Sequence, residues 1–221
     1  DFGWIGTHET VDRLEATFET MNRLEQFRGH FYNWYETRDL RPLDPKYVSS
    51  VDSGNLAGHL IALGNACREI IDRPIAGPIW LSGIEDAVAL TRESLSALAG
   101  DLRAYTVTPK QLDETLDALS AVLQSDPRTP AGLAAQLVEL GLNADSVLDI
   151  AQTLTTERGD GAGVDLLAWA DALRAAIDSH RRDVELLMPW ASLVTLDAAI
   201  APASKGVGGI SQDLSLIHIS E

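Results

Sequence analysis

A short segment near the start of the chain combines aromatic and polar side chains in a way that suits sugar binding. Residues 29–60 read GHFYNWYETRDLRPLDPKYVSSVDSGNLAGHL, and we call them the aromatic block. Aromatic faces stack on the C–H face of a sugar ring, while amides and carboxylates hydrogen-bond its hydroxyls. Three rings are candidates for stacking and three polar side chains for hydroxyl contacts. These candidate substrate-binding residues are Trp34, Tyr35 and Tyr47, with Asn33, Asp52 and Asn55.

The same block also has a purely structural interpretation. Aromatic side chains bury well, so on composition alone the rings are somewhat more easily explained as a core beneath a long loop. The polar tips of His30 and Asn33 around the rings favour binding instead. Asp52 and Ser53 lie where a loop becomes a helix, so one of them is expected to be the N-cap. Asn55 would then project from the first turn toward a hydroxyl.

Other residues whose side chains could bind a ligand or catalyse a reaction are better explained by structural roles. His59, Leu63 and Cys67 share one helical face, and without further ligands in register we interpret this face as buried core, not a metal site. Gly159–Gly163 lacks the preceding strand and the following Lys-Ser/Thr of a phosphate loop, which favours a flexible inter-helix loop. Glycosidic chemistry needs carboxylates about 5–9.5 Å apart. With 33 acidic residues, no pair can be selected, so no catalytic residue is assigned.

Helices on both sides must position the aromatic block. A first helix is expected to begin with Thr7 as N-cap and to stop at Gly29. Prolines exclude helix through the middle of the block, so a loop or irregular hairpin is expected over residues 30–51. A second helix is expected from about residue 52 to Pro74, with its apolar side facing inward. That side comprises Leu56, Leu60, Leu63, Cys67 and Ile70.

The remaining sequence predicts five more helices. Ser82 and Glu85 form a capping-box pattern for the third, and Thr-Pro pairs open the fourth and fifth. Gly141 is expected to end the fifth helix. Apolar stripes at helical spacing continue to Leu187, and period-two alternation is scarce outside the aromatic block. The fold class is therefore all-α, either a helical bundle or a partial (α/α) toroid. The fourth and fifth helices are expected to start at Thr108-Pro109 and Thr129-Pro130. The sixth is expected over residues 145–155 and the seventh over residues 164–187.

Composition limits the partners. With 221 residues and 45% hydrophobic content, the chain can bury a sizeable core. A net charge of −16, from 17 basic and 33 acidic residues, argues against nucleic acid and anionic lipid. The single Cys67 excludes an internal disulfide. No apolar run approaches the roughly 20 residues of a membrane span, and the start has no signal-peptide pattern.

Both ends suggest a fragment of a longer gene. The sequence opens at Asp1 without Met and reads like the middle of a protein. Residues 214–221 (LSLIHISE) resemble the translation of a transposon-end adapter used in preparing sequencing libraries. An ordinary amphipathic tail is the alternative. We exclude this segment from the fold analysis.

The order of residues within and before the aromatic block is specific enough to suggest a family. Residues 3–38, GWIGTHETVDRLEATFETMNRLEQFRGHFYNWYETR, and residues 42–60, PLDPKYVSSVDSGNLAGHL, closely resemble a segment of bacterial cyclic β-1,2-glucan synthases. The resemblance covers residues 3–63. It is looser over residues 75–189, a Leu/Ala-rich helical stretch that leads into LLMPWA.

This resemblance implies a very large inner-membrane enzyme with several modules. A glycosyltransferase module polymerises glucose from UDP-glucose, a glycosidase-like α/α-barrel closes the ring by transglycosylation, and a phosphorylase-like module trims chain length. The matching segment would lead into the central barrel on the cytoplasmic side. We find neither the transferase's acidic motif nor the barrel's catalytic acids, so the fragment alone is expected to be inactive. It is expected to need no cofactor of its own.

Four segments are expected on this basis. Residues 1–73 would hold the first helix, the aromatic loop and a first barrel-like helix, and residues 74–190 a helical extension. Residues 191–213 would be irregular, and residues 214–221 adapter-derived. The segment would contribute β-1,2-glucan contacts and contact the flanking modules. The alternatives are a non-catalytic scaffold, in which the later helices dock neighbouring modules and the aromatic block is packing core, or a stand-alone helical glycosidase.

Overall fold

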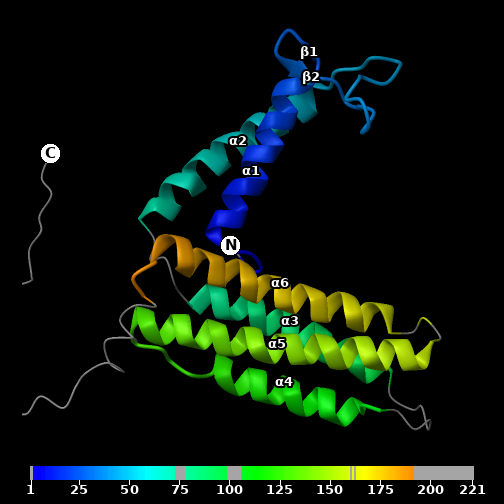
Figure 1. Ribbon diagram of the computed structural model, residues 1–221. Coiled ribbons are helices and arrows are strands. Elements are labelled where there is room, and N and C mark those ends of the chain that lie inside the picture. The colour runs from blue at the N-terminus through cyan, green and yellow to red at the C-terminus, as the bar shows by residue number, and fades with distance from the viewer. Residues whose placement is uncertain (1, 73–77, 99–105, 160, 162, 192–221) are drawn as a thin grey trace, which may run out of the picture.

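The predicted all-α class is confirmed by a computed structural model that describes residues 2–72, 78–98, 106–159, 161 and 163–191. Sequence predictions for Pro74 and residues 192–221 fall outside these residues. A two-stranded ribbon accompanies the described helices (Figure 1). The elements in chain order are α1 (Thr7–Arg23), β1 (Gln26–Phe27), β2 (His30–Phe31), α2 (Ser50–Ile71), α3 (Pro78–Ala97), α4 (Pro109–Leu123), α5 (Pro130–Arg158) and α6 (Val164–Leu187).

Helices α3 to α6 form a four-helix bundle. Each packs against two others, α3 and α5 both lying against α4 and α6, and successive helices run in opposite directions (Figure 1). Aliphatic side chains from all four helices fill the interior, as the predicted apolar stripes require. The largest of the fully buried side chains are Ile84, Leu112, Leu116, Leu119, Leu137, Leu140, Leu166, Leu173, Ile177 and His180.

Two of the predicted helix starts are confirmed at atomic detail. The Thr108 hydroxyl accepts from the Gln111 backbone N–H at 3.2 Å, and the Gln111 side chain accepts from the Thr108 N–H at 2.7 Å. Thr129 caps α5 by accepting from the Gly132 N–H at 3.0 Å. Proline follows each cap, where its missing N–H costs no helical hydrogen bond.

Two other predicted boundaries are wrong. Gly141 does not end a helix, because α5 continues unbroken to Arg158 and joins the expected fifth and sixth helices. A glycine inside a helix costs only about 1 kcal/mol, which is less than the packing of the buried leucines around it contributes. Ser82 and Glu85 do not start α3 either, because the helix already begins at Pro78.

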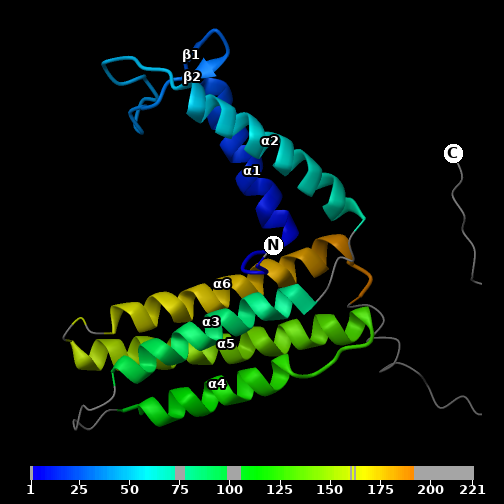
Figure 2. The ribbon, with the colours of Figure 1, turned by 180° about the vertical axis from the view of Figure 1, so that it is seen from behind.

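Helices α1 and α2 project from the bundle, and together with the loop between them we call them the arm (Figures 1 and 2). Neither helix buries a single side chain. The predicted inward side of α2 is therefore wrong: His59 and Cys67 are exposed, Leu63 is half-buried, and Leu60 is 39% exposed. Amphipathic spacing indicates which residues share a face but not whether anything covers it.

The ends of the arm helices also differ from expectation. The N-cap of α1 is Gly6, with Thr7 inside the helix, and α1 ends at Arg23. The helix therefore ends before Gly29, its predicted stop, and the chain turns through β1 and β2. Arg28 and Gly29 both take positive φ angles, 52° and 85°, as a tight hairpin turn requires. The N-cap of α2 is Ser49, whose hydroxyl accepts from the Asp52 N–H.

Candidate functional site

The aromatic block lies at the end of the arm farthest from the bundle (Figure 1). Backbone hydrogen bonds fold it back on itself: Asn33 N donates to Tyr47 O at 2.9 Å, and Leu43 N donates to Trp34 O at 3.0 Å. An isolated bridge joins Tyr35 to Pro42. These pairings bring Tyr47 beside Asn33 and Trp34, although they are thirteen or more positions apart in sequence.

Asn33 and Asp52 connect the loop to α2. The Asn33 side-chain oxygen accepts from the Ser49 N–H at 3.0 Å, and its amide nitrogen donates to the Asp52 carboxylate at 3.1 Å. Ser49 at the same time caps α2. The predicted capping role of Asp52 or Ser53 therefore belongs to Ser49, and two of the predicted binding residues hold each other in place.

Tyr35 is tied into the loop through its phenol. The hydroxyl donates to the Glu25 backbone oxygen at 2.7 Å and accepts from the Tyr32 N–H at 2.8 Å. The Tyr32 and Tyr35 rings meet edge-on at 6.3 Å. Lys46 lies 5.4 Å from the centre of the Tyr32 ring and pairs with the Glu25 carboxylate at 2.8 Å, which raises the pKa of the lysine.

The other predicted contacts are open. The Trp34 side chain is 70% exposed, Tyr47 is 59% exposed, and Asn55 is exposed on the second turn of α2. A preformed loop that presents two uncovered rings can stack on a flat apolar face without first ordering its backbone.

Sequence reasoning missed a second polar cluster, at the base of the arm. Asp183 on α6 is fully buried, and its carboxylate accepts from the backbone N–H groups of Thr7 and His8 at 2.5 and 2.8 Å. These N–H groups lie in the first turn of α1, where they have no partner within the helix and where the helix dipole also favours a negative charge. Gly6 itself has no capping side chain, so a residue from another helix caps α1.

Neighbouring residues on α6 complete this cluster, which we call the latch. Ser179 Oγ accepts from the Gly6 N–H at 2.8 Å and donates to the Glu9 carboxylate at 2.5 Å, and this donation lowers the pKa of Glu9. His180 Nε2 bonds to Gly3 O at 2.7 Å. Burial lowers the pKa of His180. The N-terminal residues are thus attached to the bundle by several hydrogen bonds.

The close fit at the latch requires small residues. A Cβ at Gly6 would lie 2.7 Å from the Asp183 carboxylate, and one at Gly83 would lie 2.0 Å from the Gly3 oxygen. Those separations are too short for non-bonded atoms, so both glycines allow close approach of two backbones.

The latch contains Ser, His and Asp but is not arranged as a nucleophilic triad. A triad needs the histidine to bond the serine hydroxyl and the aspartate to bond the histidine. Here Ser179 bonds Glu9, His180 bonds a backbone oxygen, and Asp183 bonds backbone N–H groups. The signal available in the sequence was three polar residues, Ser179, His180 and Asp183, beside or within the aliphatic stripe of α6.

Two further searches of the described residues gave negative results. No group of three or more His, Cys, Asp or Glu side chains among them could hold a metal ion. None of the described helices combines the length and apolar character needed to cross a membrane.

Comparison with known proteins shows that this all-α chain is similar in sequence to a synthase of cyclic glucan. No protein-family model matches it. Most of the chain aligns with one segment of a much larger relative, and the resemblance predicted from the sequence is confirmed. That relative is the cyclic beta-(1,2)-glucan synthase NdvB of Rhizobium meliloti (strain 1021), which is 37% identical over 183 residues. The match covers 82% of this chain and 6% of the relative.

Proposed function

We propose that this chain is a segment of a cyclic β-1,2-glucan synthase and contributes glucan contacts through the aromatic block. The observation that carries the proposal is the open presentation of Trp34 and Tyr47 at the tip of the arm. The relative's activity supplies the ligand class, a neutral glucose polymer. Such a polymer also suits a chain with a net charge of −16, which would repel an anionic one.

In this proposal the two exposed rings stack on glucose, and polar groups around them select its orientation. Asn55 bonds a hydroxyl directly. Asn33 and Asp52 already bond each other, so they hold the loop against α2 and offer their remaining acceptor sites to the sugar. Tyr35 supports the loop from beneath through its bonds to Glu25 and Tyr32.

We assign the catalytic steps of the intact synthase to its other segments. There, UDP-glucose is the donor, and a transglycosylation closes the ring. This segment would lie on the cytoplasmic side of the inner membrane, next to the module that closes the ring. We assign no catalytic acid within it, and a stand-alone glycosidase is not proposed.

A second candidate function is that of a scaffold between modules. The supporting observation is that α1 and α2 bury no side chain yet expose large apolar ones, including Phe18, Ile61 and Ile71. The alternative that the aromatic block is the packing core of the later helices has no support, because the buried core draws its side chains from α3 to α6 and from Leu98 and Ala191 just beyond α3 and α6. Contacts with flanking modules would instead form along the arm.

A pair of tryptophan variants tests the glucan proposal. In the intact synthase, Trp34→Ala should reduce ring closure while the protein still folds, because an exposed ring contributes little to stability. Trp190→Ala is the matched control, since Trp190 is 51% exposed and lies beyond the end of α6. Loss of soluble protein in Trp34→Ala, with no loss in the control, would support packing against another module and reject the glucan contact.

A further inference from the structure

A groove lies at the base of the arm, well away from the aromatic block. It has a volume of about 230 Å³ and is formed by the N-terminal residues, α1, α3 and α6. Helix α1 has 17 residues, so the groove and the loop lie about 25 Å apart along the arm. The groove therefore belongs to a different part of the surface from the proposed loop site.

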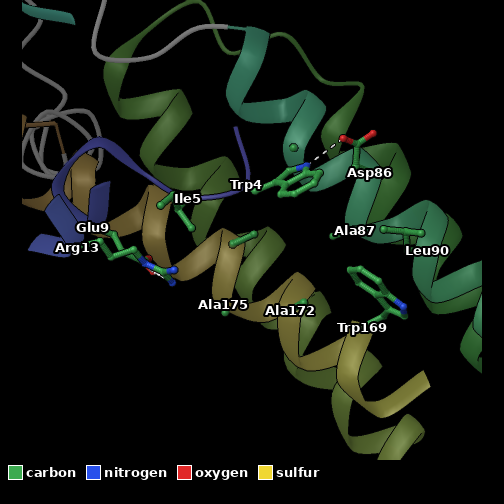
Figure 3. Close-up of a pocket in the computed structure, with 12 residues that line it drawn as sticks. Trp4, Ile5, Glu9, Arg13, Asp86, Ala87, Leu90, Trp169, Ala172 and Ala175 are labelled. Carbon is green, nitrogen blue, oxygen red and sulfur yellow. Dashed lines mark hydrogen bonds and ion pairs between the residues drawn. The ribbon is translucent and has the colours of Figure 1, made fainter. Parts of the chain in front are cut away.

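Two tryptophans define the groove (Figure 3). Trp4 is 57% exposed and Trp169 is 37% exposed, so both present aromatic surface to the groove and to solvent. In the close-up, Ala87 lies between the two indoles, and Ala172 lies on α6 beside Trp169. A floor of alanine side chains beside two aromatic plates leaves room for a flat ring.

The floor is made of small residues from two helices at helical spacing. On α6, Ala172, Ala175 and Ala176 share one face, and on α3 Gly83 and Ala87 share another. Larger side chains at the alanine positions would fill the space between the indoles, whereas Gly83 lies against the Gly3 backbone.

Trp4 is held in place before any ligand arrives. Its indole N–H donates to the Asp86 carboxylate at 3.1 Å, and the Phe2 ring lies 5.6 Å from it. The latch fixes the backbone on both sides of it, through Gly3 and Gly6. An aromatic plate that is already ordered loses little side-chain entropy on binding.

Charge argues for a neutral ligand with hydroxyl groups. The rim carries Asp86 at one end and the Glu9–Arg13 ion pair at 2.5 Å at the other. Carboxylates on the rim of a chain with net charge −16 would repel nucleotides, phosphates and anionic lipid heads. Carboxylates and a guanidinium can, however, hydrogen-bond sugar hydroxyls. A purely hydrocarbon ligand would leave those rim groups unused.

From these features we infer that the groove between Trp4 and Trp169 is a second glucan subsite, which takes one or two glucose units of a neutral chain. The inference rests on the proposed function for the choice of glucan. The groove is smaller than the pockets of about 300–1,000 Å³ that enclose drug-sized ligands, so each subsite alone binds weakly. A chain long enough to reach both the groove and the loop gains through effective concentration.

The test uses the 221-residue chain labelled with ¹⁵N, whose five tryptophans give separate indole N–H signals in NMR spectra. Single Trp→Phe variants assign these signals. Titration with a linear β-1,2-linked glucose oligomer should shift the signals of Trp4 and Trp169. Trp169→Ala should weaken the response at Trp4 by about twofold to tenfold. Trp169→Phe should retain most of it, and the control Trp190→Ala should not change it.

The readout separates this inference from the proposed function. A shift at Trp4 and Trp169 that persists in Trp34→Ala supports the groove, whatever happens at the loop. A shift at Trp34 alone supports the loop and overturns the groove. If UDP-glucose shifts the groove signals more than the neutral oligomer does, the assignment to glucan is wrong. Shielding of both indoles from a soluble quencher in the intact synthase without glucan would also overturn it, because another module would then occupy the groove.

Discussion

The bundle and the arm are both helical, and both carry apolar side chains at helical spacing, yet they use them differently. In the bundle, the predicted stripes of α4 and α5 are buried, Leu116 and Leu140 to 0% exposure. In the arm, residues with the same spacing stay partly exposed, such as Phe18 and Leu60, both at 39%. Burial therefore depends on a partner helix that lies in register, and amphipathic spacing alone does not supply one.

This contrast suggests a division of roles. The bundle is held together by its own core, whereas the arm is held at its base by the latch and at its tip by bonds within the aromatic block. The arm surface thus remains available for ligand or for neighbouring modules, and each prediction below tests one side of this contrast.

The largest expected effect compares one substitution in the two regions. Leu116→Ala should destabilise the bundle by about 2–5 kcal/mol, because it opens a cavity among fully buried side chains. Leu60→Ala in α2 should cost about 1 kcal/mol or less, because Leu60 is 39% exposed. Urea unfolding followed by circular dichroism measures both. Equal losses would mean that the arm also has a core.

The next effect concerns the connection between the regions. Asp183→Ala should cost about 2 kcal/mol at the latch, because it removes the charged cap from the Thr7 and His8 N–H groups. Hydrogen exchange should accelerate at those amides and much less at α4. Asp171→Asn is the control, since Asp171 is an exposed residue on the same helix. Unchanged exchange at Thr7 would contradict the capping role.

A smaller effect should appear with pH. Burial lowers the pKa of His180 below its ordinary value of 6.5, despite the opposing influence of the hydrogen bond to Gly3 O and of Asp183 and Glu9. The unfolded chain therefore takes up the proton first as pH falls. The contribution of His180 to the free energy of unfolding is fully present above about pH 6.5 and decreases below it, by no more than about 1.4 kcal/mol per pH unit. The lowered pKa of Glu9 acts in the same direction at more acidic pH.

A histidine variant isolates this contribution. His180→Gln should flatten the dependence of the urea midpoint on pH between 7 and 5, because the amide can still donate to Gly3 O but does not titrate. His59→Gln, at an exposed position in α2, should leave the dependence as it is. If the urea midpoints of both variants depend on pH as that of the original protein does, His180 does not contribute to the pH dependence of stability.

The smallest expected change is a gain. At Gly141 an added Cβ would meet only the Arg181 guanidinium, at 4.0 Å, which is ordinary contact distance. Gly141→Ala should therefore stabilise α5 by about 0.5–1 kcal/mol through helix propensity. A lower thermal midpoint would show that Gly141 has a packing role which its surroundings do not indicate.

Local signals in the sequence were reliable where a few neighbouring residues determine the outcome. The Thr-Pro starts of α4 and α5 depend on a hydroxyl and an N–H three residues apart, so the pattern contains the whole interaction. Gly141 and the Ser82–Glu85 pair misled because their effect depends on packing around them. Neither the latch nor the groove was predicted, because each joins the first residues of the chain to α3 or α6.

By itself the sequence determined the all-α class, the apolar stripes of the bundle and the resemblance to a glucan synthase, because periodicity, capping and residue order are properties of neighbouring residues. Only the tertiary structure decided which stripes are covered, that Trp34 is open while Tyr35 supports the loop, and that Asp183 caps a helix more than 170 positions away. Those outcomes depend on contacts between distant segments, which no local pattern records.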